Sequence, residues 1–265
     1  MSKQIKTLGY VLILIIFMSN EASSQILFGP KAGYQTNWIR YAKLYEGADY
    51  TSGNAFAPQL GALYSFKLSD KVSFYSELYY SQRGKREKTN DLVTLKRRHE
   101  AKYSFLEIPL MLRLAIPVKK DPKSPRVYLN AGPHVAYWLA GKGSLTSLET
   151  YGSTNLVETD YKILFSEPEA QEEVVFAEDA NRLQFGLSTG TGVEVPINRR
   201  GDIFQFDIRY TWGSTFMGSN LDLPVSTSGV EENFSFGHSQ LSVSVAYAFY
   251  LDIWGMRRGK SIKRR

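Results

Sequence analysis

The chain has three histidines, and these are candidate metal ligands or catalytic residues. His99 falls in a basic connecting segment, His134 within a predicted strand and His238 at the start of another. Their spacing is not that of metal ligands. The chain also has no cysteine that could supply a thiolate ligand, a thiol nucleophile or a disulfide. The sequence therefore predicts no metal site and no cofactor.

Nucleophilic and phosphate-binding motifs are equally weak. Ser239, His238 and Asp222 could be combined into a triad, but their spacing does not distinguish them from other residues of these types. The stretch 190–192, Gly-Thr-Gly, resembles part of a phosphate loop, yet no predicted helix follows it whose N-terminus could bind an anion. We therefore predict that the protein is not an enzyme and has no catalytic or cofactor-binding residues.

Strict alternation of apolar and polar residues is the main structural signal. One face of the segment 106–115 carries Leu106, Ile108, Leu110, Leu112 and Leu114, and the other carries Glu107, Pro109, Met111, Arg113 and Ala115. The segments 204–212 and 241–249 alternate in the same way. Strands of soluble proteins average about five or six residues, whereas a tilted strand that crosses a membrane needs about ten. The pattern therefore favours membrane-spanning strands.

Eight segments carry this pattern, near 27–38, 55–67, 71–83, 102–116, 125–139, 181–196, 202–213 and 236–251. The connections between them alternate in length. Those near 68–70, 117–124 and 197–201 are short, and those near 39–54, 84–101, 140–180 and 214–235 are long and polar. This arrangement is typical of outer-membrane barrels. The predicted fold is all-β: a single antiparallel up-and-down transmembrane β-barrel of eight strands, with short periplasmic turns and long extracellular loops.

Alternation alone does not say which face is inside, because a soluble barrel or sandwich also alternates. The composition of the polar face indicates that this face points inward. It carries many glycines, which weaken a strand and bring no advantage on a solvated surface. In a narrow lumen, however, they leave room for longer side chains. The charges of this face are balanced, as buried charges must be. The predicted lumen charge network is Lys31, Glu77, Glu107, Arg113, Arg182, Glu194, Asp207 and Arg209. The predicted lipid-facing residues are Leu106, Ile108, Leu110, Leu112, Phe204, Phe206, Ile208, Val243 and Val245.

Aromatic residues at the predicted strand ends support a membrane setting, because Tyr and Trp concentrate where apolar lipid tails meet headgroups. Those expected near the outer ends are Trp38, Tyr79, Tyr80, Tyr137, Trp138 and Trp212. Those expected near the inner ends are Phe249, Tyr250 and Trp254.

The N-terminus has the basic, apolar and small-residue regions of a secretory signal peptide. Its apolar stretch, residues 8–18, is shorter than the ~20 residues that span a bilayer as a helix. We predict a signal peptide over 1–24, the outer-membrane β-barrel domain over 25–251 and a basic periplasmic tail over 252–265. An even strand number places both termini in the periplasm. The protein is thus expected in the outer membrane of a Gram-negative bacterium.

The net charge of +6 is dispersed and no nucleic-acid motif is present, so nucleic acid is not an expected partner. Outer-membrane lipid is expected to surround the barrel. The basic tail, Arg257–Arg265, could contact anionic headgroups or an acidic periplasmic or envelope protein, and the extracellular loops could bind a partner as well. The loop 84–101 is basic and the loop 140–180 is acidic. Our hypothesis is that the two associate over the barrel mouth; because exposed ion pairs contribute only ~0–1 kcal/mol each, two separately solvated loops are the alternative.

Three segments carry a family resemblance: YSFLEIPLMLRL at 103–114, YLNAGPHVAYWLAGK at 128–142 and LQFGLSTGTGVEV at 183–195. With these motifs the chain resembles the PorT-like outer-membrane β-barrel family over 26–251. The resemblance implies an outer-membrane barrel and links the family's namesake to secretion and gliding. It implies no catalytic residue.

The functional expectation is a non-enzymatic barrel with a closed, salt-bridged lumen and a structural or protein-interaction role in the cell envelope, with secretion as one setting. The first alternative is a small, porin-like solute channel, which would need a continuous wet path through the lumen. The second is a soluble periplasmic ligand-binding barrel, which would need an apolar interior and a charged exterior.

Overall fold

The computed structural model describes residues 25–41, 50–52, 55–89, 98–121, 124–148, 156–165, 174–177, 180–198, 201–218, 225–227, 230–232, 234 and 236–252. Their strands are β1 (Gln25–Tyr41), β2 (Tyr50–Ser52), β3 (Ala55–Lys67), β4 (Val72–Thr89), β5 (Arg98–Pro117), β6 (Arg126–Leu148), β7 (Leu156–Leu164), β8 (Val174–Phe176), β9 (Leu183–Pro196), β10 (Ile203–Gly213), β11 (Val225–Thr227), β12 (Val230–Glu232) and β13 (Phe236–Asp252). None of the described residues belongs to a helix long and apolar enough to cross a membrane.

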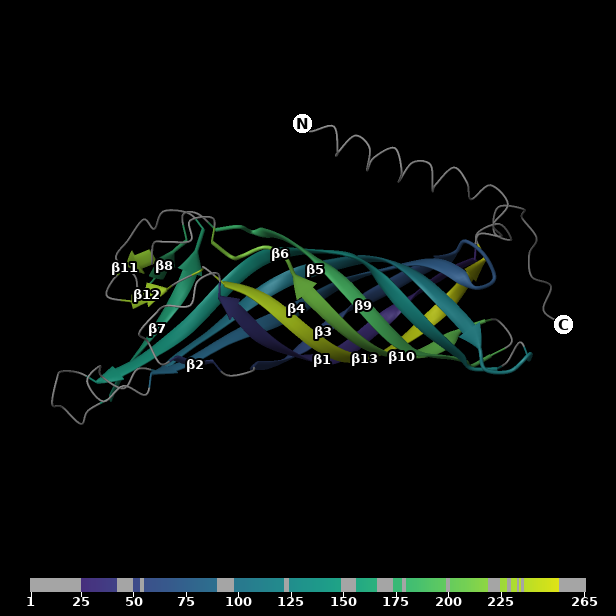
Figure 1. Ribbon diagram of the computed structural model, residues 1–265, viewed down its shortest axis with the longest axis horizontal. Helices are drawn as coiled ribbons and strands as arrows, with labels where there is room; N and C mark the ends of the chain where they lie inside the picture. The colour runs from purple at the N-terminus through teal and green to yellow at the C-terminus, as the bar shows by residue number, and fades with distance from the viewer. Residues whose placement is uncertain are drawn as a thin grey trace, which may run out of the picture.

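Eight long strands close into one antiparallel barrel (Figure 1). In chain order these are β1, β3, β4, β5, β6, β9, β10 and β13, and each pairs with the next. The last strand returns to the first, from Gln25 opposite Asp252 to Tyr41 opposite Phe236, so no edge is left open in the wall. The predicted up-and-down barrel of eight antiparallel strands is confirmed.

The two ends of the barrel differ. At one end β1 begins, β13 ends, and short connections join β3 to β4, β5 to β6 and β9 to β10; we call it the turn end. At the other, which we call the loop end, β7, β8, β11 and β12 gather beyond the barrel (left in Figure 1). The short turns of outer-membrane barrels are periplasmic, so the prediction that the loop end faces the cell exterior is kept as a prediction.

The β9–β10 connection at the turn end depends on Gly201. Its φ of 95° lies in the left-handed region that favours glycine. The neighbouring Asp202 accepts a hydrogen bond of 2.7 Å from the Asn198 amide, and Asp202 Oδ1 accepts one of 2.9 Å from the Tyr250 backbone N–H. The turn is therefore tied to the end of β13.

We expect Gly201→Val to lower the free energy of unfolding by about 1–2 kcal/mol, because an L-residue in a left-handed conformation costs about that much. Gly201→Asn should cost less, since Asn tolerates this region. Urea unfolding of the two variants in detergent micelles measures both. Equal losses would show that the backbone conformation is not what selects glycine here.

Part of the long connections at the loop end is strand. β4 continues to Thr89 and β5 begins at Arg98, and the two pair along this extension. β6 runs on to Leu148 and pairs with both β5 and β7, while β8 joins β7 in parallel. The segments 84–101 and 140–180 looked like loops because they are rich in charge. A ladder is held by backbone hydrogen bonds, however, and outside the membrane its outward face can be polar.

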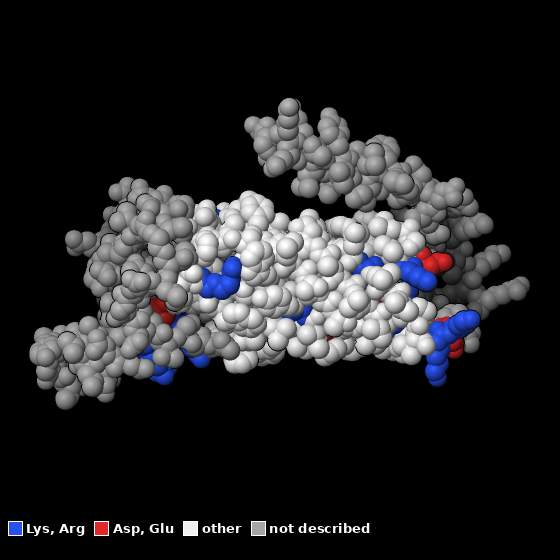
Figure 2. Space-filling view, viewed as in Figure 1, with Lys and Arg blue, Asp and Glu red and all other residues white. Residues whose placement is uncertain are grey.

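The barrel is apolar outside and polar inside. Along β10 the outward residues Phe204, Phe206 and Ile208 are exposed, whereas Gln205, Asp207 and Arg209 between them are buried. Figure 2 shows the same ordering on one face: charged side chains gather toward the two ends and the middle of the barrel is mostly uncharged. This arrangement is the reverse of a soluble barrel, in which the apolar face turns inward.

Candidate functional site

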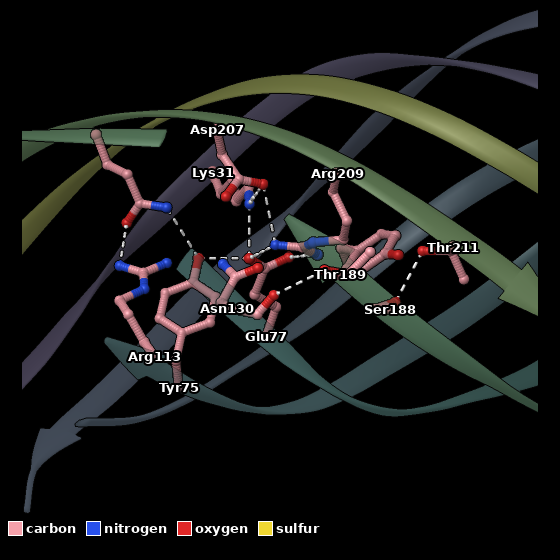
Figure 3. Close-up of polar contacts among 12 residues, drawn as sticks. Lys31, Tyr75, Glu77, Arg113, Asn130, Ser188, Thr189, Asp207, Arg209 and Thr211 are labelled. Carbon is pink, nitrogen blue, oxygen red and sulfur yellow. Dashed lines mark hydrogen bonds and ion pairs between the residues drawn. The ribbon is translucent and has the colours of Figure 1, made fainter. Parts of the chain in front are cut away.

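A first lumen network, Lys31, Tyr75, Glu77, Asp207 and Arg209, centres on one carboxylate. The Arg209 guanidinium donates two hydrogen bonds to Glu77, of 2.8 and 2.6 Å, in a bidentate pair. Lys31 Nζ lies 2.6 Å from Glu77 Oε1 and 3.1 Å from Asp207 Oδ1, and the Tyr75 hydroxyl also donates to Glu77. These five side chains, all labelled in Figure 3, converge from β1, β4 and β10. All four charges are buried, so they persist because they neutralise one another.

Arg113 extends this network toward the turn end. It donates from Nη1 to Glu194 over 2.6 Å and to the Gln205 amide oxygen over 3.1 Å. Its guanidinium carbon lies 3.6 Å from the centre of the Tyr75 ring and 3.8 Å from that of Tyr128. A planar cation stacked against two aromatic faces is held on both sides.

A second lumen network surrounds Glu107 nearer the loop end. Arg83 Nη2 lies 2.9 Å from Glu107 Oε2, and His134 Nε2 lies 2.6 Å from the same oxygen. Gln240 donates to it over 3.0 Å, and Ser81 donates to the other carboxylate oxygen. The Glu107 side chain is fully buried, yet both of its oxygens accept hydrogen bonds.

Apolar clusters lie at either end of these networks. The turn-end cluster consists of Leu27, Leu63, Tyr75, Met111, Ile203, Ala246 and Ala248. The loop-end cluster is larger and rich in aromatic residues: Ala101, Tyr103, Phe105, Ala136, Trp138, Leu145, Tyr161, Ile163, Val175, Ala177, Met217, Phe234 and Phe236. It combines barrel strands with residues from β7, β8 and the segments beside Met217 and Phe234. We call this assembly the cap.

Little space remains between the second network and the cap. The cavity there, lined by Arg83, His134, Gln184, Thr211, His238 and Gln240 among others, has a volume of about 10 Å³, which is room for about one water molecule. Glycines contribute to the tight fit: a Cβ atom at Gly192 would lie 2.6 Å from Cζ of Tyr128. At this level the lumen is thus filled by side chains.

Most of the predicted lumen charges meet in these networks. Seven of the eight lie buried in the lumen: Lys31, Glu77, Glu107, Arg113, Glu194, Asp207 and Arg209. Arg182 does not join them, and its assignment to the lumen is wrong. It precedes β9, hydrogen-bonds to the Trp138 carbonyl oxygen over 3.3 Å and stacks on Tyr137 and Phe165 at the loop end. The alternation that predicted its direction does not apply before the strand begins.

Sequence reasoning missed Arg83 and His134, the two groups that neutralise and orient Glu107. A signal for both was present. Arg83 lies six residues after Glu77 on β4, an even number, so both side chains fall on the same face of the strand. His134 lies two residues after Gly132 on β6 and therefore shares its inward face. Strand parity alone would have placed both side chains in the lumen.

The predicted lipid-facing residues all lie on the outward face. Ile108, Leu112, Phe204, Phe206, Ile208, Val243 and Val245 are exposed, and Leu106 and Leu110 are half-buried on the same face of β5. Among the aromatics, Tyr80, Tyr137 and Trp212 point outward near the loop end. Tyr79 and Trp138 are instead buried in the interior, so their assignment to the outer aromatic belt is wrong. Both fall on the inward parity of their strands.

The chemistry available in the lumen is limited by burial. Ser188, His134 and Glu107 are joined in a chain, with 3.1 Å from Ser188 Oγ to His134 Nδ1 and 2.6 Å from His134 Nε2 to Glu107. This order matches a catalytic triad, but Ser188 also bonds Thr211 over 2.8 Å and is 2% exposed. Across the described residues, no three His, Cys, Asp or Glu side chains form a metal-binding group.

Several predicted features lie outside the described residues. These are the signal peptide 1–24, Asp222, Trp254 and the basic tail Arg257–Arg265. They stay predictions, as does the domain division at residues 24 and 251.

Known outer-membrane proteins resemble this chain in fold at low sequence identity. Its fold is similar to outer membrane protein OprG from Pseudomonas aeruginosa, at 12% identity, with 87% of this chain and 97% of that chain covered and a TM-score of 0.46. The outer membrane protease OmpT from Escherichia coli follows at 10% identity, 86% and 97% coverage and a TM-score of 0.42. Outer membrane protein W from E. coli has 13% identity, 87% and 100% coverage and a TM-score of 0.36. No curated protein sequence matches significantly.

The family comparison is more direct. The family model described as "Outer membrane protein beta-barrel domain" matches residues 18–215, which is most of the chain. This match agrees with the closed eight-stranded barrel and its apolar outer face. The chain therefore belongs to the outer membrane protein β-barrel domain family and is an outer-membrane protein.

Proposed function

We propose that this protein is a non-enzymatic barrel with a closed lumen, which serves the cell envelope as a structural or protein-interaction component through its loop end. One observation carries the proposal: the lumen is occupied by two paired-charge networks that lie between apolar clusters. A solute would have to displace these side chains to pass. Because each carboxylate in the networks is buried against cations, such displacement would separate buried ion pairs at high cost.

The cap supports a role for the loop end. It is a folded structure tied by backbone hydrogen bonds, among them Met217 N–H to Phe236 O at 2.9 Å, Gly218 N–H to Phe234 O at 2.8 Å and Ala177 N–H to Leu164 O at 2.9 Å. A preorganised surface loses less conformational entropy when it binds a partner than mobile loops would. The resemblance to PorT-like barrels supports secretion or envelope assembly as the setting of that contact. The basic tail Arg257–Arg265 is a second candidate contact, on the periplasmic side.

An enzymatic role is disfavoured by the surroundings of Ser188. A nucleophile needs space for a substrate carbonyl or phosphoryl group beside it. The neighbouring cavity of about 10 Å³ provides none. The buried chain Ser188–His134–Glu107 therefore serves to hold Glu107 in place.

We expect the purified protein to give no steady single-channel conductance in a planar lipid bilayer, because paired side chains and the two apolar clusters close the path. A general porin reconstituted in the same bilayer is the positive control. Discrete, reproducible conductance steps from folded wild-type protein would contradict the proposal and favour the small solute channel.

The exposed end can be tested separately because the chain has no native cysteine. Glu158→Cys places a unique thiol on the outward, exposed side of β7, and Lys119→Cys places one at the turn end. A membrane-impermeant maleimide applied to intact cells should label the first variant and spare the second. Labelling of the second variant alone would show that the barrel has the opposite orientation. If the first variant is labelled, a photo-crosslinker attached to the thiol of Glu158→Cys can then be used to capture a partner outside the cell.

A further inference from the structure

Three lysines form a row across the outward face of the loop-end sheet. Lys102 on β5 stands opposite Lys142 on β6, and Lys142 stands opposite Lys162 on β7. All three are exposed. Neighbouring strands are ~4.8 Å apart, so the row spans roughly 10 Å. Like charges directly opposite one another destabilise a sheet. An anion bound against the three ammonium groups would reduce this repulsion.

No ion pair within 4 Å is formed by these three lysines with any residue that the structure describes. The acidic neighbours compensate the three lysines only in part, since Glu100 interacts with Lys102 at longer range. Glu100 is already engaged by Arg98, which donates hydrogen bonds of 3.0 and 2.6 Å, and by Arg86 at 3.7 Å. Hydrogen bonding from Arg98 also lowers the pKa of Glu100, so this carboxylate stays ionised and paired. Asp160 is the remaining acidic group beside the row.

The row borders an open hollow of about 550 Å³. Its lining includes all three lysines together with Glu100, Ser144 and Asp160. The hollow can therefore receive a polar group of substantial size, and the ammonium groups supply three cationic donors for it.

The position of the row points to the membrane surface. On the barrel side of Lys102 the outward residues of β5 are Ser104, Leu106 and Ile108, the last of which is exposed and lipid-facing. On β6 the outward residues Leu139 and Ala140 lie on the barrel side of Lys142. Tyr80 and Tyr137 stand on either side of Leu106, four residues toward the barrel from Lys102, and their outward-facing rings mark the rim of the apolar belt. The lysines thus stand a few residues beyond the rim of the apolar belt, where long cationic side chains reach headgroups.

We propose that Lys102, Lys142 and Lys162 form a binding site for the phosphate groups of an anionic glycolipid in the outer leaflet. The occupant is a membrane lipid rather than a soluble anion, because the row is continuous with the lipid-facing surface. The site lies on the outer wall of the barrel and does not depend on whether the lumen conducts.

Bis-phosphorylated lipid A in neutral detergent micelles is a suitable probe. A basic residue near an anionic surface contributes ~1 kcal/mol to binding. Each single Lys→Gln variant should therefore bind lipid A about fivefold more weakly, and the variant with all three substitutions on the order of 100-fold more weakly. The matched control is the triple variant Lys71→Gln, Lys119→Gln and Lys120→Gln, which removes three exposed lysines from the turn end. It should bind lipid A as the wild type does.

Stability in lipid-free detergent provides a second measurement. The variant with Gln at positions 102, 142 and 162 should unfold at the same urea concentration as the wild type or at a higher one, because like-charge repulsion is removed. Weaker binding by this variant could then not be attributed to misfolding. Wild-type affinity in that variant would overturn the proposal, as would an equal loss in the turn-end control. Competition by millimolar inorganic pyrophosphate as strong as that by lipid A would assign the site to a soluble phosphate instead. Loss of binding with dephosphorylated lipid A would support the proposal.

Discussion

Glu77→Gln is expected to lower the free energy of unfolding by about 3–5 kcal/mol, because it removes one partner from a buried ion network. In the native protein Glu77 accepts hydrogen bonds from Lys31, from both Arg209 nitrogens and from Tyr75. Glutamine keeps a single acceptor oxygen and turns an N–H₂ donor toward these donors. Two buried cations would then share Asp207 alone. Urea titration of refolding into lipid vesicles, followed by tryptophan fluorescence, measures the loss.

A second substitution separates the charge effect from lost packing. Adding Lys31→Met to Glu77→Gln restores equal numbers of cations and anions around Asp207, and we expect the double variant to be more stable than Glu77→Gln alone. Glu100→Gln is the surface control, since its partners Arg98 and Arg86 are exposed and exposed pairs contribute ~0–1 kcal/mol. If Glu77→Gln costs no more than Glu100→Gln, the lumen charges are not held as a paired network.

Leu110→Arg is expected to cost about 2–4 kcal/mol in a lipid bilayer, the penalty for a cation on the lipid face near the bilayer midplane. Leu110 lies at the centre of the outward apolar run of β5, which extends from Leu106 through Ile108, Leu112 and Leu114 to Ile116. The guanidinium would have no partner and no water at that depth. The measurement is the free energy of folding into vesicles.

The same substitution at other depths provides the control. Val118 is 60% exposed directly beyond β5 at the turn end, and Val118→Arg should cost about 0–1 kcal/mol because penalties fall off toward the interface. Leu114→Arg should lie between the two. A cost that does not vary with depth would show that this face of β5 does not meet lipid.

The barrel itself was predictable from local sequence. Period-two alternation over ten or more residues is a property of each strand alone, and it placed the eight barrel strands within a few residues at the turn end, where short turns set the boundaries. Parity along a strand then assigns each side chain to the lumen or the lipid face. Glu107 and Leu110 could be placed by this rule without knowledge of any partner.

The cap could not be predicted in this way. It is assembled from residues such as Tyr161, Val175, Met217 and Phe234, which are separated along the chain and lie outside the eight predicted strands. β8 and the segments beside Met217 and Phe234 are too short to show a period, and each becomes apolar core only when the others cover it. The row of lysines was missed for the same reason, since Lys102, Lys142 and Lys162 become neighbours only through the register of β5, β6 and β7.

The sequence by itself determined the eight barrel strands, their inward and outward faces and the types of charge in the lumen, because these depend on alternation within one strand. Only the tertiary structure decided which charges meet. It paired Glu77 with Lys31 and Arg209, gave Glu107 the partners Arg83 and His134, and left Arg182 outside on aromatic rings. The physical reason is that ion pairing across a barrel depends on stagger between strands distant in sequence, which no local pattern encodes.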